Sequence, residues 1–303
     1  LESIYDPCCG SGGMLIQASK YLVQHGGNPV KLFMFGQEKN RNTFVIARMS
    51  MFLHGYDNAH IEHGDTFINP KFLDNGKLKR HDIVLANPPW NQNNWHYDKW
   101  KDGDPYNRFV FGLPSKKSGD WAWLQLMYAS LKPCGRMGIV MDNGVLFRGA
   151  SEGKIRKKFL EKDLIEAVIG LPSNLFYNTG SPGCLVLFNG NKPKKRKNKV
   201  LFIDASKDYL EGKKQNQLRQ KDIEKTAKTF GKFETVERYC TVAGLDEIEE
   251  NDYNLNISRY VDTTEPEEIV DIVGVLSNLD LLETERKEIQ KDINKFLRKL
   301  GYK

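Results

Sequence analysis

Short apolar runs alternate with amphipathic stretches along the first two thirds of the chain. Runs rich in β-branched and aromatic residues predict β-strands at residues 3–5, 32–35, 60–62, 83–86, 137–141, 167–170, 185–188 and 200–203. Apolar residues at helical spacing predict helices over residues 14–24, 43–54 and 121–131. Strands that alternate with helices are typical of an α/β fold, in which a mostly parallel, doubly wound sheet carries helices on both faces.

The last two predicted strands indicate an antiparallel edge to this sheet. Only the turn at residues 189–199 separates residues 185–188 from residues 200–203. A parallel connection needs a crossover of a dozen or more residues, usually containing a helix, and that turn leaves no room for one.

The pattern changes after residue 205, and we expect three parts. Residues 1–205 form the catalytic α/β domain, residues 206–262 an irregular extension packed on it, and residues 263–303 an amphipathic helical segment. Apolar residues of the last part recur largely at i, i+3 and i+4 spacing, at Ile269, Ile272, Leu276, Leu279, Leu282, Ile289, Ile293, Phe296 and Leu300. One or two helices are expected there, and their apolar stripe either packs on the main domain or binds a partner helix.

Composition excludes few functions. Hydrophobic residues make up 40% and charged residues 28% of the 303, as in ordinary soluble proteins, and no apolar run approaches the roughly 20 residues of a membrane span. The five cysteines have no zinc-site spacing, which indicates structural thiols in a reducing cytoplasm and no metal. A net charge of +6 mildly favours an anionic partner. The chain starts at Leu1, inside a predicted strand, so we expect a fragment that lacks an N-terminal part.

Two loops are unusual in length or charge. Residues 91–119 are polar and aromatic without clear periodicity, and loops of this length are usually functional or disordered. Residues 192–199 read KPKKRKNK, which favours a solvated hairpin tip and leaves a phosphate contact as the alternative.

Three segments at successive strand ends predict a pocket for an adenosine without phosphates. The first predicted strand runs into a glycine-rich turn, where the backbone approaches a ligand closely: Asp6, Pro7, Cys8, Cys9, Gly10, Ser11, Gly12 and Gly13. Glu38 follows the second strand and can accept both hydrogen bonds of a ribose diol. Asp65 and Thr66 follow the third, where a carboxylate can accept a hydrogen bond from an adenine amine. Neither the dinucleotide glycine pattern nor a P-loop lysine is present.

The most specific pattern is Asn87, Pro88, Pro89 and Trp90, directly after the apolar strand at residues 83–86. The lone pair of adenine N6 is delocalised into the ring, which makes this amine a poor nucleophile. The Asn87 side-chain oxygen and the Pro88 carbonyl can each accept one N6 hydrogen and aim the lone pair at a methyl donor. Two prolines keep these acceptors in place, and the Trp90 ring can stack on a base rotated out of the duplex.

With these residues in order, the chain resembles amino-group methyltransferases of Rossmann-like fold, and downstream motifs narrow the family. Residues 108–114, 120–124, 143–149, 152–157, 168–180 and 253–258 are similar to segments of the modification (methylase) subunit of type I restriction–modification systems. The resemblance runs from residue 1 to about residue 262 and rests on separate motifs in the expected order.

The resemblance implies an S-adenosylmethionine-dependent enzyme that methylates adenine N6 in double-stranded DNA. The turn from Asp6 to Gly13, Glu38 and Asp65 would then bind the cofactor, and the segment from Asn87 to Trp90 would be catalytic. The second aromatic ring that sandwiches the flipped base is expected within residues 171–180, with Phe176 as the candidate and a core role for it as the alternative. The family also implies a specificity subunit, and a restriction subunit, as partners, and the helices at residues 267–300 as a docking element.

Two departures from the family pattern affect these expectations. Family members carry an N-terminal helical domain and an aromatic-containing segment before the glycine-rich turn, and both are missing from this sequence. Trp90 replaces a more usual Phe or Tyr, which implies a wider pocket.

The alternatives are an RNA-base or protein-glutamine methyltransferase, a non-catalytic scaffold, and a nicotinamide-dependent oxidoreductase. The long loop at residues 91–119 and the motifs after residue 170 disfavour the first. The segment from Asn87 to Trp90 disfavours the second for the complete protein, whereas the expected loss of the N-terminal part leaves it open for a fragment. The glycine spacing disfavours the third.

Overall fold

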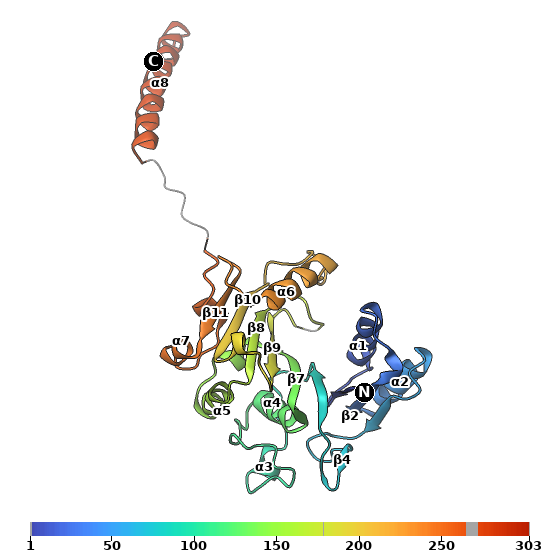
Figure 1. Cartoon of the computed structure of the whole chain (residues 1–303). Helices are drawn as coiled ribbons and strands as arrows, with labels where there is room; N and C mark the ends of the chain where they lie inside the picture. Colours follow the sequence, from blue (N-terminus) through green and yellow to red (C-terminus); the bar gives the residue numbers. More distant parts are fainter. Residues whose placement is uncertain (1, 178, 265–271, 303) are drawn as a thin grey trace. The chain divides into compact units, whose positions relative to one another are not determined.

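A computed structural model describes residues 2–177, 179–264 and 272–302. The chain divides into two compact units, Leu1–Thr263 and Thr264–Lys303 (Figure 1). The first unit contains a nine-stranded sheet and every candidate site residue.

All eight predicted strands are present in one sheet, whose order is β11-β10-β8-β9-β7-β6-β1-β2-β3. Five of the neighbouring pairs are parallel and three are antiparallel, so the expected α/β fold is confirmed. The strands are β1 (Glu2–Asp6), β2 (Leu32–Glu38), β3 (His60–His63), β6 (His81–Ala86), β7 (Leu131–Asp142), β8 (Ile165–Gly170), β9 (Gly183–Asn189), β10 (Lys199–Asp204) and β11 (Cys240–Gly244). A separate hairpin consists of β4 (Leu73–Asp74) and β5 (Lys77–Leu78).

The three helices predicted within residues 1–205 correspond to α1, α2 and α4, and the predicted C-terminal amphipathic segment contains α8, whereas the other α-helices were not predicted. The α-helices are α1 (Gly13–Gln24), α2 (Arg41–Leu53), α3 (Tyr97–Trp100), α4 (Asp120–Ala129), α5 (Ala150–Glu161), α6 (Gln220–Lys232), α7 (Leu245–Glu250) and α8 (Ile272–Lys299). Short 3₁₀ helices are η1 (Pro29–Lys31), η2 (Asn143–Leu146), η3 (Lys194–Arg196) and η4 (Ile257–Arg259).

The antiparallel edge is formed by different strands from those that the sequence suggested. β11 pairs antiparallel with β10 at the edge of the sheet, while β9 runs antiparallel between β7 and β8 in its interior. Both hydrogen-bonding edges of β9 are therefore occupied, and β10 cannot pair with it. β10 instead crosses to the far side of β8 and pairs with it in parallel.

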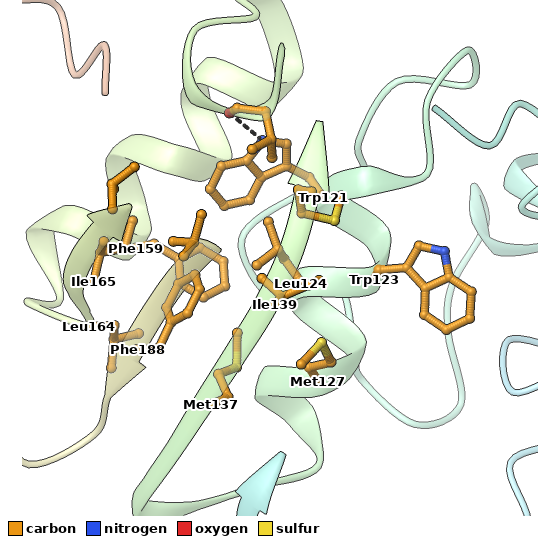
Figure 2. Packing of buried hydrophobic residues seen from close by; sticks show 14 of the residues in the cluster. Trp121, Trp123, Leu124, Met127, Met137, Ile139, Phe159, Leu164, Ile165 and Phe188 are labelled. Carbon is orange, nitrogen blue, oxygen red and sulfur yellow. Dashed lines mark hydrogen bonds between the residues drawn. The ribbon is translucent and has the colours of Figure 1, made fainter. Parts of the chain in front are cut away.

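Alternate residues along the strands belong to hydrophobic clusters on opposite faces. Ile4 of β1 packs with residues of α1 and α2, whereas the neighbouring Tyr5 belongs to the cluster that includes residues of α4 and α5. Figure 2 shows part of that second cluster, in which Phe159 of α5 contacts the rings of Trp121 of α4 and Phe188 of β9. Helices therefore cover both faces, and the ends of the strands are left for a site.

The segment at residues 206–262, expected as an irregular extension, contains α6, β11 and α7, and β11 joins the main sheet. The basic turn before β10 is also more structured than a solvated tip. Arg196 donates to Glu166 and to the carbonyl oxygens of Phe230 and Gly231, and the buried Lys192 pairs with Asp163. Two cations of the basic turn, Arg196 and Lys192, therefore connect it to other segments of the fold.

The second unit contains one long helix, α8. The amphipathic segment was expected from residue 267, and residues 265–271 lie outside the described residues. Within the described residues no helix is long and apolar enough to cross a membrane.

Candidate active site

The glycine-rich turn connects β1 to α1 and lies beside the end of β2. Gly10 and Gly12 have φ angles of 54° and 82°, a left-handed conformation that glycine adopts without strain. A side chain at Gly12 would also place its Cβ 2.6 Å from Met51 Cε of α2, so the Met51 side chain would have to shift. The turn therefore brings its backbone close to the neighbouring strand ends.

Glu38 at the end of β2 is tied to this turn. Its Oε2 accepts a hydrogen bond from Gly10 N at 3.0 Å, and its Oε1 accepts one from Asn40 N at 2.7 Å. A carboxylate has about four acceptor positions, so acceptor capacity remains for a ligand hydroxyl. Asp6 is buried behind the turn. Burial raises its pKa to about 7, and the nearby charge of Glu38 adds to this effect.

Asp65, after β3, is held by three donors from different segments. Its Oδ1 accepts from Phe67 N at 3.0 Å, while Lys39 Nζ and His96 Nε2 lie 2.8 Å and 3.0 Å from its Oδ2. Burial opposes ionisation of Asp65, but the hydrogen bonds from Lys39 and His96 outweigh it and hold the pKa below its usual value. Asp65 is therefore a fixed, ionised acceptor.

The loop at residues 91–119 is ordered by a buried arginine. Arg108 is fully buried and pairs with Asp104 through two nitrogen atoms. Its Nη1 donates to the carbonyl oxygens of Thr66 and Phe67, at 3.2 Å and 2.9 Å. The loop, which the sequence identified as functional or disordered, thus holds the turn that carries Asp65.

The segment Asn87, Pro88, Pro89 and Trp90 follows β6 at the same edge of the sheet. Asn87 is exposed, and among the described residues neither its side chain nor the Pro88 carbonyl takes part in a hydrogen bond. Trp90 is fixed, because its Nε1 donates to Val140 O at 3.2 Å. Two acceptors are therefore available beside an oriented aromatic ring.

Trp90 and Phe176 contact each other at this site. Their ring centroids are 4.9 Å apart with an interplanar angle of 72°, an edge-to-face arrangement. Phe176 comes from the connection between β8 and β9, more than 80 residues after Trp90 along the chain. A base that stacks between the two rings requires them to separate.

Most of the candidate residues line one cleft of about 860 Å³. Its lining includes Pro7, Glu38, Asp65, Thr66, Asn87, Pro88, Pro89, Trp90 and Phe176. Asp6, Gly10, Ser11, Gly12 and Gly13 are absent from that lining, so they shape the turn behind it. The sequence did not single out several other residues of the lining: Lys39, Trp123, Asp142, Leu175 and Gln215.

A second network, which includes the buried Asp120 and Glu152, lies next to the segment from Asn87 to Trp90. Arg148 donates to Asn91 Oδ1 at 2.8 Å, to Glu152 Oε2 at 2.7 Å and to the buried Asp120. Asp120 also accepts from Asn91 N at 2.9 Å. This network fixes the residue directly after Trp90. In the described part of the chain, no group of three His, Cys, Asp or Glu side chains could hold a metal ion.

Comparison with known proteins assigns the chain to a family. The family model described as N-6 DNA methylase matches residues 1–269. The type I restriction enzyme MjaVIII methylase subunit of Methanocaldococcus jannaschii is 42% identical, over 99% of this chain and 53% of that protein. The HindI methylase subunit of Haemophilus influenzae is 36% identical, over 99% of this chain and 69% of that protein.

A solved structure agrees in fold. The type I restriction-modification methyltransferase subunit of Streptococcus thermophilus has a TM-score of 0.77 at 38% identity and covers 87% of this chain and 54% of its own. The chain thus spans about half the length of that subunit and of the Methanocaldococcus relative. The resemblance drawn from the motifs is confirmed, and the chain belongs to the N-6 DNA methylase family.

Proposed function

We propose that this chain is the catalytic region of the modification subunit of a type I restriction–modification system. It transfers a methyl group from S-adenosylmethionine to adenine N6 in double-stranded DNA, in the cytoplasm. A specificity subunit and a restriction subunit are its proposed partners. The observation that carries the proposal is that Asn87, Pro88 and Trp90 line the same cleft as Glu38 and Asp65.

The residues of the cleft fit S-adenosylmethionine by their charge and hydrogen-bonding capacity. Glu38 and Asp65 are carboxylates, which suit the hydroxyls and amine of an adenosine and the positive charge of a sulfonium, and repel phosphates. Glu38 retains acceptor capacity for the ribose, and Asp65 for the adenine amine. When bound, S-adenosylmethionine supplies a methyl group on a good leaving group, so the protein need only position the reactants.

The target base is held by acceptors and rings from the same edge of the sheet. In the proposed mechanism, Asn87 Oδ1 and the Pro88 carbonyl each accept one N6 hydrogen, which turns the nitrogen lone pair out of conjugation. Pro88 and Pro89 restrict the backbone so that both acceptors stay in place. The Phe176 side chain moves away from the fixed Trp90 ring so that both stack on the adenine, which contributes roughly 1–3 kcal/mol per stacked base.

Product analysis tests this function. The complete protein is incubated with labelled S-adenosylmethionine and, in parallel, duplex DNA, RNA and protein, together with any specificity subunit that co-purifies with it. We expect label in DNA only, recovered as N6-methyladenine after digestion to nucleosides. Label in RNA or protein alone, or in cytosine, would contradict the proposal.

The helical segment at residues 267–300 is proposed as the docking element for a partner subunit. The amphipathic pattern of α8 supports this, because the helix alone buries no side chain within its own unit. Deletion of this segment should abolish co-purification of the specificity subunit. Unchanged co-purification would contradict the assignment.

A further inference from the structure

The loop at residues 205–219, between β10 and α6, closes on itself in a compact turn. Leu210 and Gln217 exchange backbone hydrogen bonds of 2.8 Å and 3.0 Å across it. A Cβ atom at Gly212 would lie 2.0 Å from Gln215 O, so the turn closes too tightly for any side chain at that position. This fixes the place of the residues at its tip, Gln215 and Asn216.

Gln215 and Asn216 bind three successive backbone carbonyls of another segment. Asn216 Nδ2 donates to Ser173 O at 2.9 Å, and Asn216 N donates to Asn174 O at 2.8 Å. Gln215 Nε2 donates to Leu175 O at 2.7 Å. Asn216 is buried, with 7% of its surface exposed, so its hydrogen bonds are shielded from water.

These three carbonyls directly precede Phe176. The segment between β8 and β9 contains no helix or strand among its described residues, so few backbone bonds hold it. Near its ends, Leu171 N donates to Gly183 O at 2.9 Å, and within it Asn174 N donates to Gly180 O at 3.3 Å. The contacts from Gln215 and Asn216 are therefore a large share of what fixes the backbone that carries Phe176.

Gln215 also reaches the cleft itself. It lines the same cavity as Phe176 and Trp90, whereas the cofactor acids Glu38 and Asp65 come from the ends of β2 and β3. The loop thus acts on the part of the cleft that contains the two rings.

We propose that Gln215 and Asn216 are positioning residues that set the place of Phe176, and thereby control engagement of the target base rather than binding of the cofactor. The role in engaging the target base rests on the proposed function. The contact between the two segments is a property of the protein alone, and it can be measured without any ligand.

The first measurement is amide hydrogen exchange of residues 171–181 in the purified protein. Gln215→Ala and Asn216→Ala each remove a donor to this segment, so exchange should accelerate about tenfold, the effect of one lost buried hydrogen bond. Gln217→Ala is the matched control, because its exposed side chain makes no hydrogen bond among the described residues. If burial of Asn216 makes its variant unstable, the half-buried Gln215 still provides the test.

The second measurement separates base engagement from cofactor binding. With 2-aminopurine at the target position, both variants should give a several-fold smaller fluorescence rise and a lower kcat, with an unchanged affinity for S-adenosylmethionine. Unchanged exchange at residues 171–181, or a parallel loss of cofactor affinity, would overturn the inference. If the wild-type protein methylates no DNA but exchange is still faster in the variants, the proposed function is refuted. The contact that positions residues 171–181 is then still supported.

Discussion

Lys39 and Asp65 form an ion pair across the ends of β2 and β3, with 2.8 Å between Nζ and Oδ2. The Asp65 side chain is 18% exposed, so the pair lies at the rim of the cleft. His96 adds a second contact to the same oxygen. Oδ1 keeps one acceptor position beyond the bond from Phe67 N, which is the position proposed to accept from an adenine amine.

Asp65→Ala should therefore weaken S-adenosylmethionine binding by about tenfold or more, since a hydrogen bond to a charged acceptor is lost. Isothermal titration calorimetry measures this directly. Asp98→Ala is the matched control, because Asp98 pairs with Lys116 in an exposed position outside the cleft. Equal affinities of the wild type and the Asp65 variant would remove Asp65 from the cofactor site.

Gly183→Ala should weaken engagement of the target base without affecting Glu38 and Asp65. Its Cβ would lie 2.9 Å from both Phe176 Cε2 and Trp90 Cη2, so the two rings must move. We expect kcat/KM for DNA to fall about tenfold, as small misplacements of substrate-positioning groups do, with cofactor affinity unchanged. Gly231→Ala, in open space on α6, serves as the control. Full activity of the Gly183 variant would show that the ring arrangement is not required.

Arg148→Met should destabilise the protein by about 3–5 kcal/mol, because it leaves Asp120 and Glu152 buried without their cation. Burial already raises the pKa of Glu152, although Arg148 opposes this. Urea unfolding measures the loss. Lys228→Met breaks an exposed pair with Glu224 and should change stability by less than about 1 kcal/mol. Similar losses in both variants would contradict the role given to Arg148.

His81 should make stability depend on pH. It is fully buried in β6, stacks on Tyr5 with ring centroids 4.8 Å apart, and neither ring nitrogen has a hydrogen-bond partner among the described residues. Burial lowers its pKa from 6.5 to about 4, with a contribution from Lys79 and Lys132. Its stabilising effect is complete above pH 6.5 and is lost as the pH falls towards 4, because the unfolded chain binds the proton more readily.

The difference between the wild type and His81→Phe isolates this effect. The stability of the wild type relative to the variant should fall by about 3 kcal/mol between pH 7 and pH 4. Asp6 has the opposite pH dependence, since its pKa is raised to about 7 and its stabilising effect is lost as the pH rises, but it is present in both proteins. A difference that does not change with pH would show that His81 is not held neutral.

The fold was predictable where local pattern determines it. The strands that precede Glu38 and Asn87 contain continuous apolar runs at residues 32–35 and 83–86, so their positions could be predicted. The place of β9 between β7 and β8 could not, because pairing is a long-range property. Helix α5 escaped notice because its buried residues, among them Ile155 and Phe159, are separated by charged ones.

The same distinction holds for the site. Asn87 to Trp90 is a contiguous segment that carries its chemistry in the sequence. The contacts of His96 with Asp65 and of Gln215 with Leu175 join residues 31 and 40 positions apart, and nothing local marks them. The residues that the sequence did not predict, His96 and Gln215, are those whose contacts form only in the folded protein, between loops far apart in the sequence.

The proposed role of Asn87 is tested most directly by comparing the wild type with Asn87→Ala in single-turnover methyl transfer to DNA, with S-adenosylmethionine affinity measured on the same preparations. Asn87 is exposed and makes no side-chain hydrogen bond among the described residues, so the variant should fold normally. We predict a loss of methyl transfer of about 100-fold or more, the effect of removing a positioned acceptor at the reacting atom, with cofactor affinity within about twofold. Retained transfer, or cofactor affinity that falls in parallel with it, would contradict the account.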